Sequence, residues 1–398
     1  MRRCFTIRNL LSVLLLAAYL PMCAQGPPGD TASLLQEAGR AMAAGDLVSA
    51  EEKLQWILHS SPDNYRALDL LGILRAQQQR NSEAEQIFRR VIKSKPDYSS
   101  THIDLGLLYI QMGEADKAVP ELEEGVHLAP ERTDATAALA GALRDEAHSA
   151  SAQDPEKALS LLLRARKLAP NDPDVPFDLG MVELRMSLFP DAADAFQQAL
   201  NLRTNDAPAI YGLGRAFMEL AKFQDAHDQF VRYVALRPND ASGHYALGMS
   251  SAALQLAPEA RSEFQKSIAL QPAQTESYFR LGLLDLDGKD YAAAEQNLQH
   301  VLGRDPKHAG TLAALGRVRL ETKKYDEAAD VLQRAVLSDN SLREAHYYLG
   351  LTYARMGRKE DSDHQLQIAT ELEKQATEKQ RTVFKIIDPG TTSAADPK

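Results

Sequence analysis

Cysteine is nearly absent from this chain of 398 residues. The two cysteines, Cys4 and Cys23, both lie within the first 24 residues. Residues 25–398 therefore have no disulfide bond, no thiol nucleophile and no thiolate ligand for a metal. They also have no apolar run near the ~20 residues that a membrane-spanning helix requires. No His-x-x-x-His or His-Glu-x-x-His pair occurs, so the motif of a metal hydrolase is missing as well.

Basic residues are also too few for a nucleic-acid-binding surface. Residues 25–398 carry 42 basic and 55 acidic residues, a formal net charge of −13. Nucleic-acid binding needs a basic footprint, so we expect no nucleic acid among the partners. Glycine-rich phosphate loops are missing, and Asp287-Gly288-Lys289-Asp290 is interpreted as a turn between helices, without the further ligands of a calcium loop. We therefore predict a protein that is not an enzyme and uses no cofactor or metal.

The first residues have the pattern of an export signal. Arg2, Arg3 and Arg8 form a basic head, and the apolar run 10–20 follows. Small residues then stand at Cys23 and Ala24, so residues 1–24 are interpreted as a signal peptide. Three alternatives stay open: cleavage after Ala24, a lipoprotein anchored through Cys23, and an uncleaved anchor. Each predicts an exported protein, periplasmic or associated with the cell envelope. Unless the anchor stays uncleaved, the protein is expected to touch the membrane only through a lipid at Cys23 or through a partner.

A regular spacing of glycines runs through most of the chain. Eight glycines belong to this series, and every interval between neighbouring ones is 34 residues except one, which is 74. Alanine follows seven of them by 12 positions, with Ser362 after the eighth, and Phe or Leu follows by 16. The glycines are Gly72, Gly106, Gly180, Gly214, Gly248, Gly282, Gly316 and Gly350. A fixed period of this length predicts a repeat array.

Each repeat is predicted to be two helices joined by a tight turn. In residues 207–240 the first helix has the stripe Ile210, Leu213, Gly214 and Phe217, and the second has Ala226, Phe230 and Tyr233 on one face. The turn is expected at 221–223. The Pro-Asn-Asp segment ends the unit, because proline cannot continue a helix and Asn or Asp caps the next one. The small residues of this repeat, Gly214 and Ala226, lie where the two helices should cross.

This pattern resembles the tetratricopeptide repeat, with Leu-Gly in helix A, Ala and Phe in helix B, and a closing Pro. The resemblance covers residues 31–376 and implies an all-α fold, a right-handed superhelical α-solenoid of about ten helix pairs. The repeats start at residues 31, 65, 99, 133, 173, 207, 241, 275, 309 and 343, and the fourth has 40 residues. Its six extra residues are expected within 146–153.

The remaining segments are short. Residues 25–30 are interpreted as a spacer, 377–385 as an extension of the capping helix, and 386–398 as a disordered tail. The last repeat has a polar second helix, which suits the end of a stack. The ten histidines are scattered and are interpreted as structural or solvent-facing, and His102 and His346 take the fourth repeat position, where packing between repeats is expected.

The resemblance also indicates where a partner would bind. In this family helix A lines the concave surface, and repeat positions 2, 5, 9, 12 and 13 contact peptides. Aromatic residues occupy position 5 in four consecutive repeats, and aromatic and Met side chains favour binding surfaces. The candidate peptide-binding residues are Phe177, Met181, Tyr211, Arg215, Tyr245, Met249, Phe279, Leu283 and Tyr347. The alternative is that position 5 packs sideways on a neighbouring helix.

Two further expectations concern charged residues on helix A. Arg215 with Glu219, and Arg317 with Glu321, stand four residues apart on one face. They are expected to pair with each other, and the alternative is that they anchor a polar ligand. The family's clamp for acidic C-terminal peptides uses Lys and Asn, and positions 5 and 9 carry neither in any repeat. We therefore predict no recognition of that kind.

The functional prediction is a non-catalytic protein–protein interaction scaffold of the bacterial cell envelope. An extended or helical segment of a protein partner would bind in the concave groove near residues 174–287. One alternative is an accessory protein for envelope assembly or for polysaccharide export or secretion. A second is the regulatory array of a glycosyltransferase-type enzyme, which would need a catalytic domain of several hundred residues, whereas about 22 follow the array.

Overall fold

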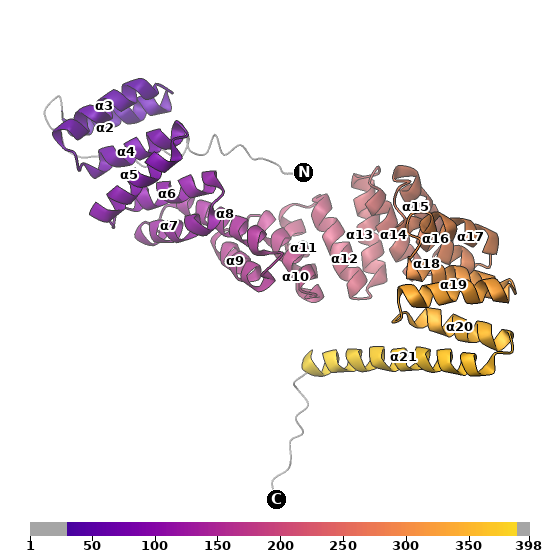
Figure 1. The fold of residues 1–398 in the computed structure, drawn as a ribbon. Coiled ribbons are helices and arrows are strands. Elements are labelled where there is room, and N and C mark those ends of the chain that lie inside the picture. Colours follow the sequence, from indigo (N-terminus) through magenta and orange to yellow (C-terminus); the bar gives the residue numbers. More distant parts are fainter. Residues whose placement is uncertain (1–29, 388–398) are drawn as a thin grey trace, which may run out of the picture. The chain divides into compact units, whose positions relative to one another are not determined.

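The computed structural model describes residues 30–387, and these residues form twenty α-helices without a strand (Figure 1). The chain divides into two compact bodies, an N-terminal body that ends at Ala216 and a C-terminal body that begins at Phe217. The predicted signal peptide and residues 388–398 of the predicted tail lie outside the described residues. Within each body, successive helices form the pairs that the repeat pattern predicts, so the all-α solenoid is confirmed.

The helices of the N-terminal body are α2 (Thr31–Ala43), α3 (Leu47–Ser60), α4 (Tyr65–Gln77), α5 (Asn81–Ser94), α6 (Ser99–Met112), α7 (Ala115–Leu128), α8 (Thr133–Ala150), α9 (Pro155–Leu168), α10 (Asp174–Arg185) and α11 (Phe189–Leu202). Helix α12 (Ala207–Glu219) contains the boundary between the bodies. The C-terminal body continues with α13 (Phe223–Leu236), α14 (Ala241–Ala253), α15 (Ala257–Leu270), α16 (Glu276–Asp287), α17 (Tyr291–Leu302), α18 (Ala309–Glu321), α19 (Tyr325–Ser338), α20 (Arg343–Arg355) and α21 (Lys359–Ile387).

The recurring apolar positions form the core of both bodies. The seven recurring alanines are fully buried, and the Phe or Leu four residues later is at most 1% exposed in the same seven repeats. In the last repeat Ser362 replaces the alanine, and its hydroxyl donates a hydrogen bond of 2.8 Å to the carbonyl oxygen of Gly350. This bond satisfies a polar group that would otherwise be buried at a cost.

Glycine at repeat position 8 is required by the close crossing of the two helices in a repeat. A Cβ atom on Gly72 would lie 2.4 Å from a ring carbon of Phe88, and one on Gly316 would lie 2.4 Å from Leu332. Real Cβ contacts do not come this close, so a side chain here would push the helices apart. The glycine period of the sequence therefore marks a packing requirement.

The turn between the two helices also has a fixed conformation. Its residue at repeat position 15 has a positive φ in nine repeats: Gly45, Gln79, Gly113, Ser187, Ala221, Gln255, Lys289, Lys323 and Gly357. Glycine adopts this left-handed region at no steric cost, whereas the other residues are strained there. Lys289 belongs to the Asp287–Asp290 segment, which joins α16 to α17 as a turn.

The irregular repeats differ from the others in helix length. In the fourth repeat, α8 has 18 residues, so part of its insertion lengthens the first helix. Asp154 then caps α9 by accepting a hydrogen bond of 2.9 Å from the main-chain N–H of Lys157. The last helix, α21, continues to Ile387, so the first two residues of the predicted tail, 386 and 387, are helical.

Side-chain hydrogen bonds and ion pairs connect neighbouring repeats at position 11 of helix A, and we call these contacts polar ties. Arg75 in α4 donates hydrogen bonds of 2.6 and 2.8 Å to Glu51 in α3, and the Tyr109 hydroxyl donates one of 2.9 Å to Glu85. Arg319 binds Glu295 in the same way. In all three ties the partner stands 24 residues earlier, on the second helix of the preceding repeat. Asp285 reverses the charges and pairs with Arg261 at 2.5 Å.

Candidate functional site

In the N-terminal body, the predicted binding residues lie on α10 and α12. Phe177 is half-buried, and its ring lies 5.9 Å from that of Phe196 in α11, the second helix of its own repeat. Met181, one turn further along α10, is 40% exposed. On α12, Tyr211 is half-buried and Arg215 is exposed. Phe177 therefore packs sideways with part of its surface, as the alternative interpretation expected, and keeps the rest accessible.

In the C-terminal body, Tyr245 and Met249 lie on α14 and are both half-buried. The centroid of the Tyr245 ring lies 6.0 Å from that of the Phe264 ring. Tyr245 and Met249 both pack against the buried cluster of Ala260, Phe264 and Leu281. Leu281 belongs to α16, so this cluster links α14, α15 and the first helix of the next repeat. The two side chains are held in place by packing while part of each stays at the surface.

The next predicted pair, Phe279 and Leu283, lies on α16 and is also half-buried. The rings of Phe279 and His308 make a T-shaped contact with 5.1 Å between their centroids, and the Arg280 guanidinium lies 5.8 Å from the centre of the Phe279 ring. Phe279 and Leu283 both pack against an apolar cluster that includes residues of α18. An aromatic ring beside a cationic group can bind apolar or anionic groups.

Tyr347 on α20 is the most exposed aromatic of the C-terminal set, at 40%. Its ring lies 5.3 Å from that of Tyr348. Between α16 and α20 stands α18, where position 5 is the buried Ala313 and position 9 is Arg317. We use the name C-terminal row for Tyr245, Met249, Phe279, Leu283 and Tyr347.

The pairing that we predicted for Arg317 is wrong. Its guanidinium binds the carboxylate of Asp287 at 3.0 Å, across to the preceding repeat, instead of Glu321 on its own helix. It also lies 5.7 Å from the centre of the Tyr348 ring. The sequence analysis missed Asp287 and Tyr348 beside this row. Asp287 could have been found, because it occupies repeat position 13 of the preceding repeat, and position 13 is one of the family's contact positions.

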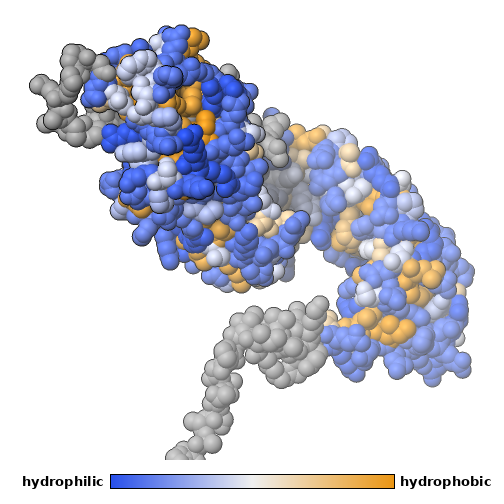
Figure 2. Space-filling view, turned by 60° about the vertical axis from the view of Figure 1, so that its left-hand side comes forward, coloured by the Kyte–Doolittle hydropathy of each residue, from blue (hydrophilic) through white to orange (hydrophobic). Residues whose placement is uncertain are grey.

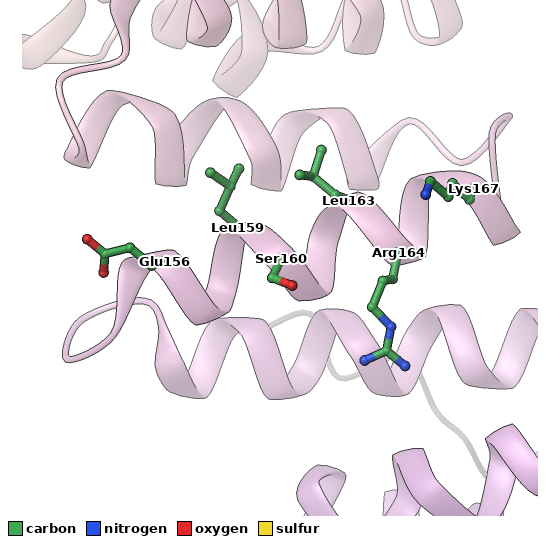
Figure 3. Close-up of a pocket in the computed structure, with 6 residues that line it drawn as sticks. All are labelled: Glu156, Leu159, Ser160, Leu163, Arg164 and Lys167. Atoms are coloured by element: carbon green, nitrogen blue, oxygen red, sulfur yellow. The ribbon is translucent and has the colours of Figure 1, made fainter.

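On the face shown in Figure 2, the described residues are largely hydrophilic, with separate hydrophobic patches in each body. Helix α9 borders a shallow pocket of about 350 Å³. Figure 3 shows Leu159 and Leu163 pointing to one side of α9, with Glu156 and Lys167 towards opposite ends and Arg164 on the other side. Arg164 pairs with Glu123. These charged groups do not converge on one point (Figure 3).

Among the residues that the structure describes, no group of three or more His, Asp or Glu side chains is placed to hold a metal ion. No helix in that part of the chain is both long enough and apolar enough to cross a lipid bilayer.

Comparisons with solved structures find other helical repeat proteins. MamA from Desulfovibrio magneticus RS-1 is 22% identical, with 42% of this chain and 96% of that chain covered and a TM-score of 0.41. YrrB, described as a tetratricopeptide protein with an unusual peptide-binding site, is 18% identical, with coverages of 48% and 95% and a TM-score of 0.40. A repeat protein from Cytophaga hutchinsonii is 16% identical, with coverages of 62% and 99% and a TM-score of 0.49. Scores this low support no functional transfer.

Sequence models of protein families give the family directly. None of the curated proteins compared with the chain matches it. Two models, both described as tetratricopeptide repeat, match along the array. One matches residues 75–143 and 285–351, and the other matches residues 35–99, 150–209 and 211–275. Together with the helix pairs and their glycine, alanine and phenylalanine positions, these matches show that the chain belongs to the tetratricopeptide repeat family, whose domains bind protein partners.

Proposed function

We propose that the protein is a non-catalytic scaffold of the bacterial cell envelope, which binds an extended or helical segment of a partner protein on its helix A surfaces. The observation that carries this proposal is the partial exposure of aromatic and Met side chains at equivalent helix A positions in both bodies. Phe177, Met181 and Tyr211 supply it in the N-terminal body, and the C-terminal row supplies it in the other. The predicted export signal supports the envelope as the location.

The packing of these side chains is suited to binding. Tyr245 and Phe279 are each fixed by neighbouring rings, so little side-chain entropy is lost when a partner covers their exposed parts. Tyrosine also offers a hydroxyl that can bond to a peptide. Such rigid aromatic anchors commonly contribute most of the binding energy of an interface.

The binding surface is tested by capture of partners from the envelope fraction of the native host. The test variant carries Tyr245→Ser and Tyr347→Ser. A matched control carries Leu236→Ser and Leu270→Ser, because these leucines of α13 and α15 are 42% and 41% exposed but belong to the second helices of their repeats. We expect the wild type and the control to retain one partner that the test variant loses, with all three giving the same circular dichroism spectrum. Equal capture by all three would contradict the proposed surface.

The location is tested by the mass of the N-terminal peptide from protein purified from the host. A peptide beginning at Gln25 would show cleavage after Ala24, and a lipid-modified Cys23 would show a lipoprotein. A peptide that begins at Met1 in soluble cytoplasmic protein would contradict the envelope. Hydrolase or transferase activity of purified residues 25–398 well above background would contradict the non-catalytic role.

A further inference from the structure

Three histidines at repeat position 4 make the same set of contacts. They are His102 in α6, His244 in α14 and His346 in α20. In each, Nε2 lies 2.9 to 3.0 Å from the main-chain carbonyl oxygen six residues earlier, in the turn that closes the preceding repeat: Pro96, Pro238 and Asn340. In each, Nδ1 lies 2.6 to 2.9 Å from a side chain 19 residues later, on helix B: Glu121, Glu263 and Gln365. We call these contacts the histidine clamps.

The partners of the ring fix where its protons must be. A carbonyl oxygen only accepts hydrogen bonds, so Nε2 carries a proton in all three clamps. In the clamps of His102 and His244, Nδ1 faces a carboxylate, which also only accepts when it is ionised. Both contacts are made together when the ring is a cation, and they are then charge-assisted hydrogen bonds.

The third clamp differs in one functional group. The amide of Gln365 can turn about its last torsion and donate its NH₂ group to Nδ1. The His346 clamp can therefore keep both contacts whether or not Nδ1 carries a proton. It has an amide on helix B where the other two clamps have an acid.

The charged surroundings favour the cation at His102. The ring is buried, and Glu121 and Glu124 of α7 both face it. The hydrogen bond to Glu121 raises the pKa of His102, burial opposes the rise, and the carbonyl of Pro96 and the charge of Glu124 add to it.

The second clamp has a different set of charged and titratable neighbours. From α15, Glu263 faces His244 and also accepts a hydrogen bond of 2.6 Å from Lys266. From α13, the ring of Tyr233 packs against Gly243, and its hydroxyl bonds to Asp240 at the start of α14. Burial acts to raise the pKa of Glu263, but the hydrogen bonds from Lys266 and His244 outweigh it and lower that pKa. Glu263 therefore stays ionised beside the ring.

We propose that the His102–Glu121 clamp is pH-sensitive: both of its hydrogen bonds are made while the imidazole carries two protons, and the bond to Glu121 is lost when the ring loses one. The His346–Gln365 clamp keeps both of its contacts in either protonation state. When Nδ1 loses its proton, its lone pair faces the carboxylate and the tie to helix B is lost. The His102–Glu121 clamp lies in the N-terminal body. Alkaline conditions therefore weaken one defined point of the array, the contact between α6 and α7.

The direction of the effect follows from proton linkage. The folded state binds a proton at His102 more tightly than the unfolded chain, whose histidines have a pKa of about 6.5. The stabilisation is complete below that value and is lost as the pH rises through the raised pKa of the folded protein. Each unit of difference corresponds to about a tenfold change in the equilibrium.

The first test is a titration of the ten histidine rings in the full chain, followed by ¹⁵N NMR of the ring nitrogens. Single His→Asn variants assign the signals. We expect His102 to have protons on both nitrogens at pH 6 and to lose the Nδ1 proton at higher pH. A neutral His102 ring at pH 6 would overturn the proposal.

The second test replaces the acid of the His102 clamp with an amide. Glu121→Gln should lower the titration midpoint of His102, because it removes the carboxylate that holds the Nδ1 proton. The substitution keeps the size of the side chain, and the wild-type titration does not depend on it. An unchanged midpoint in the folded variant would show that helix B does not hold the proton, against the proposal.

Discussion

At the scale of single residues, each glycine has a role that its surroundings define. Gly72 lies against the Phe88 ring, whereas Gly141, in α8, has nothing within 4 Å of the place where a Cβ atom would stand. Alanine forms helices better than glycine by about 1 kcal/mol, so only the contacts distinguish the two positions.

This difference predicts opposite effects of one substitution. Gly72→Ala should destabilise the protein by about 1 to 2 kcal/mol, because the overpacking of the Phe88 ring exceeds the gain in helix propensity. Gly141→Ala should stabilise it by up to about 1 kcal/mol. Urea unfolding followed by circular dichroism measures both. A Gly72→Ala variant as stable as Gly141→Ala would contradict the packing explanation.

The turn residues with positive φ predict a second pair of opposite effects. Ala221 has a φ of 55° without being glycine, and Gly113 has a φ of 77° with open space around it. Ala221→Gly should relieve strain and stabilise by about 0.5 to 1 kcal/mol, whereas Gly113→Ala should cost about 1 kcal/mol. Thermal unfolding of the two variants checks this, and the same sign for both would rule out backbone strain as the cause.

At the scale of helices, one of the charged residues at the position of the polar ties lacks the partner that the others have on the preceding repeat. Glu183 in α10 takes the position of Arg75 and Tyr109, but 24 residues earlier stands Leu159, which cannot pair with it. Glu183 is only 7% exposed, and one of its carboxylate oxygens is buried without a hydrogen bond. Burial raises the pKa of Glu183 to about 7, Asp191 adds to the rise, and Arg166 opposes it.

The incomplete tie predicts a pH dependence of stability. The folded state binds the proton of Glu183 more tightly than the unfolded chain, so stability falls as the pH rises from about 4.5 to about 7. Glu183→Gln removes the carboxyl group that binds this proton. The variant should be more stable than the wild type by about 2 kcal/mol at pH 8 and nearly equal to it at pH 4.5.

Urea unfolding of both proteins at several pH values measures this difference. Leu159→Arg is the complementary variant, because it supplies the cation that Asp285 has in Arg261, and it should stabilise the wild-type Glu183 at pH 8. A stability difference between Glu183→Gln and the wild type that does not change with pH would contradict the raised pKa.

At the scale of the whole molecule, stability should be local. In a repeat array each unit contacts its neighbours, so a substitution weakens its own region first. We expect Gly72→Ala to accelerate amide hydrogen exchange in α4 to α7 and to leave α18 to α21 unchanged. Mass spectrometry of exchanged peptides measures this. Equal acceleration in both bodies would show that the chain unfolds as one cooperative block.

The sequence by itself determined the repeat and its core. Gly72, Ala84 and Phe88 recur at fixed spacings because every repeat must solve the same crossing of two helices, and a requirement that recurs leaves a visible period. The six extra residues of the fourth repeat were also visible as a break in that period, and α8 takes part of them as additional helix.

Only the tertiary structure decided how individual side chains are used. The partial exposure of Phe279, the pairing of Arg317 with Asp287 and the lack of a partner at Glu183 depend on contacts between residues that are about 20 to 30 positions apart. The same holds for His244, whose place in a clamp with Glu263 the sequence analysis overlooked. The period reports what all repeats share, whereas function and pH response depend on where neighbouring repeats differ, and those differences take effect only when the helices pack.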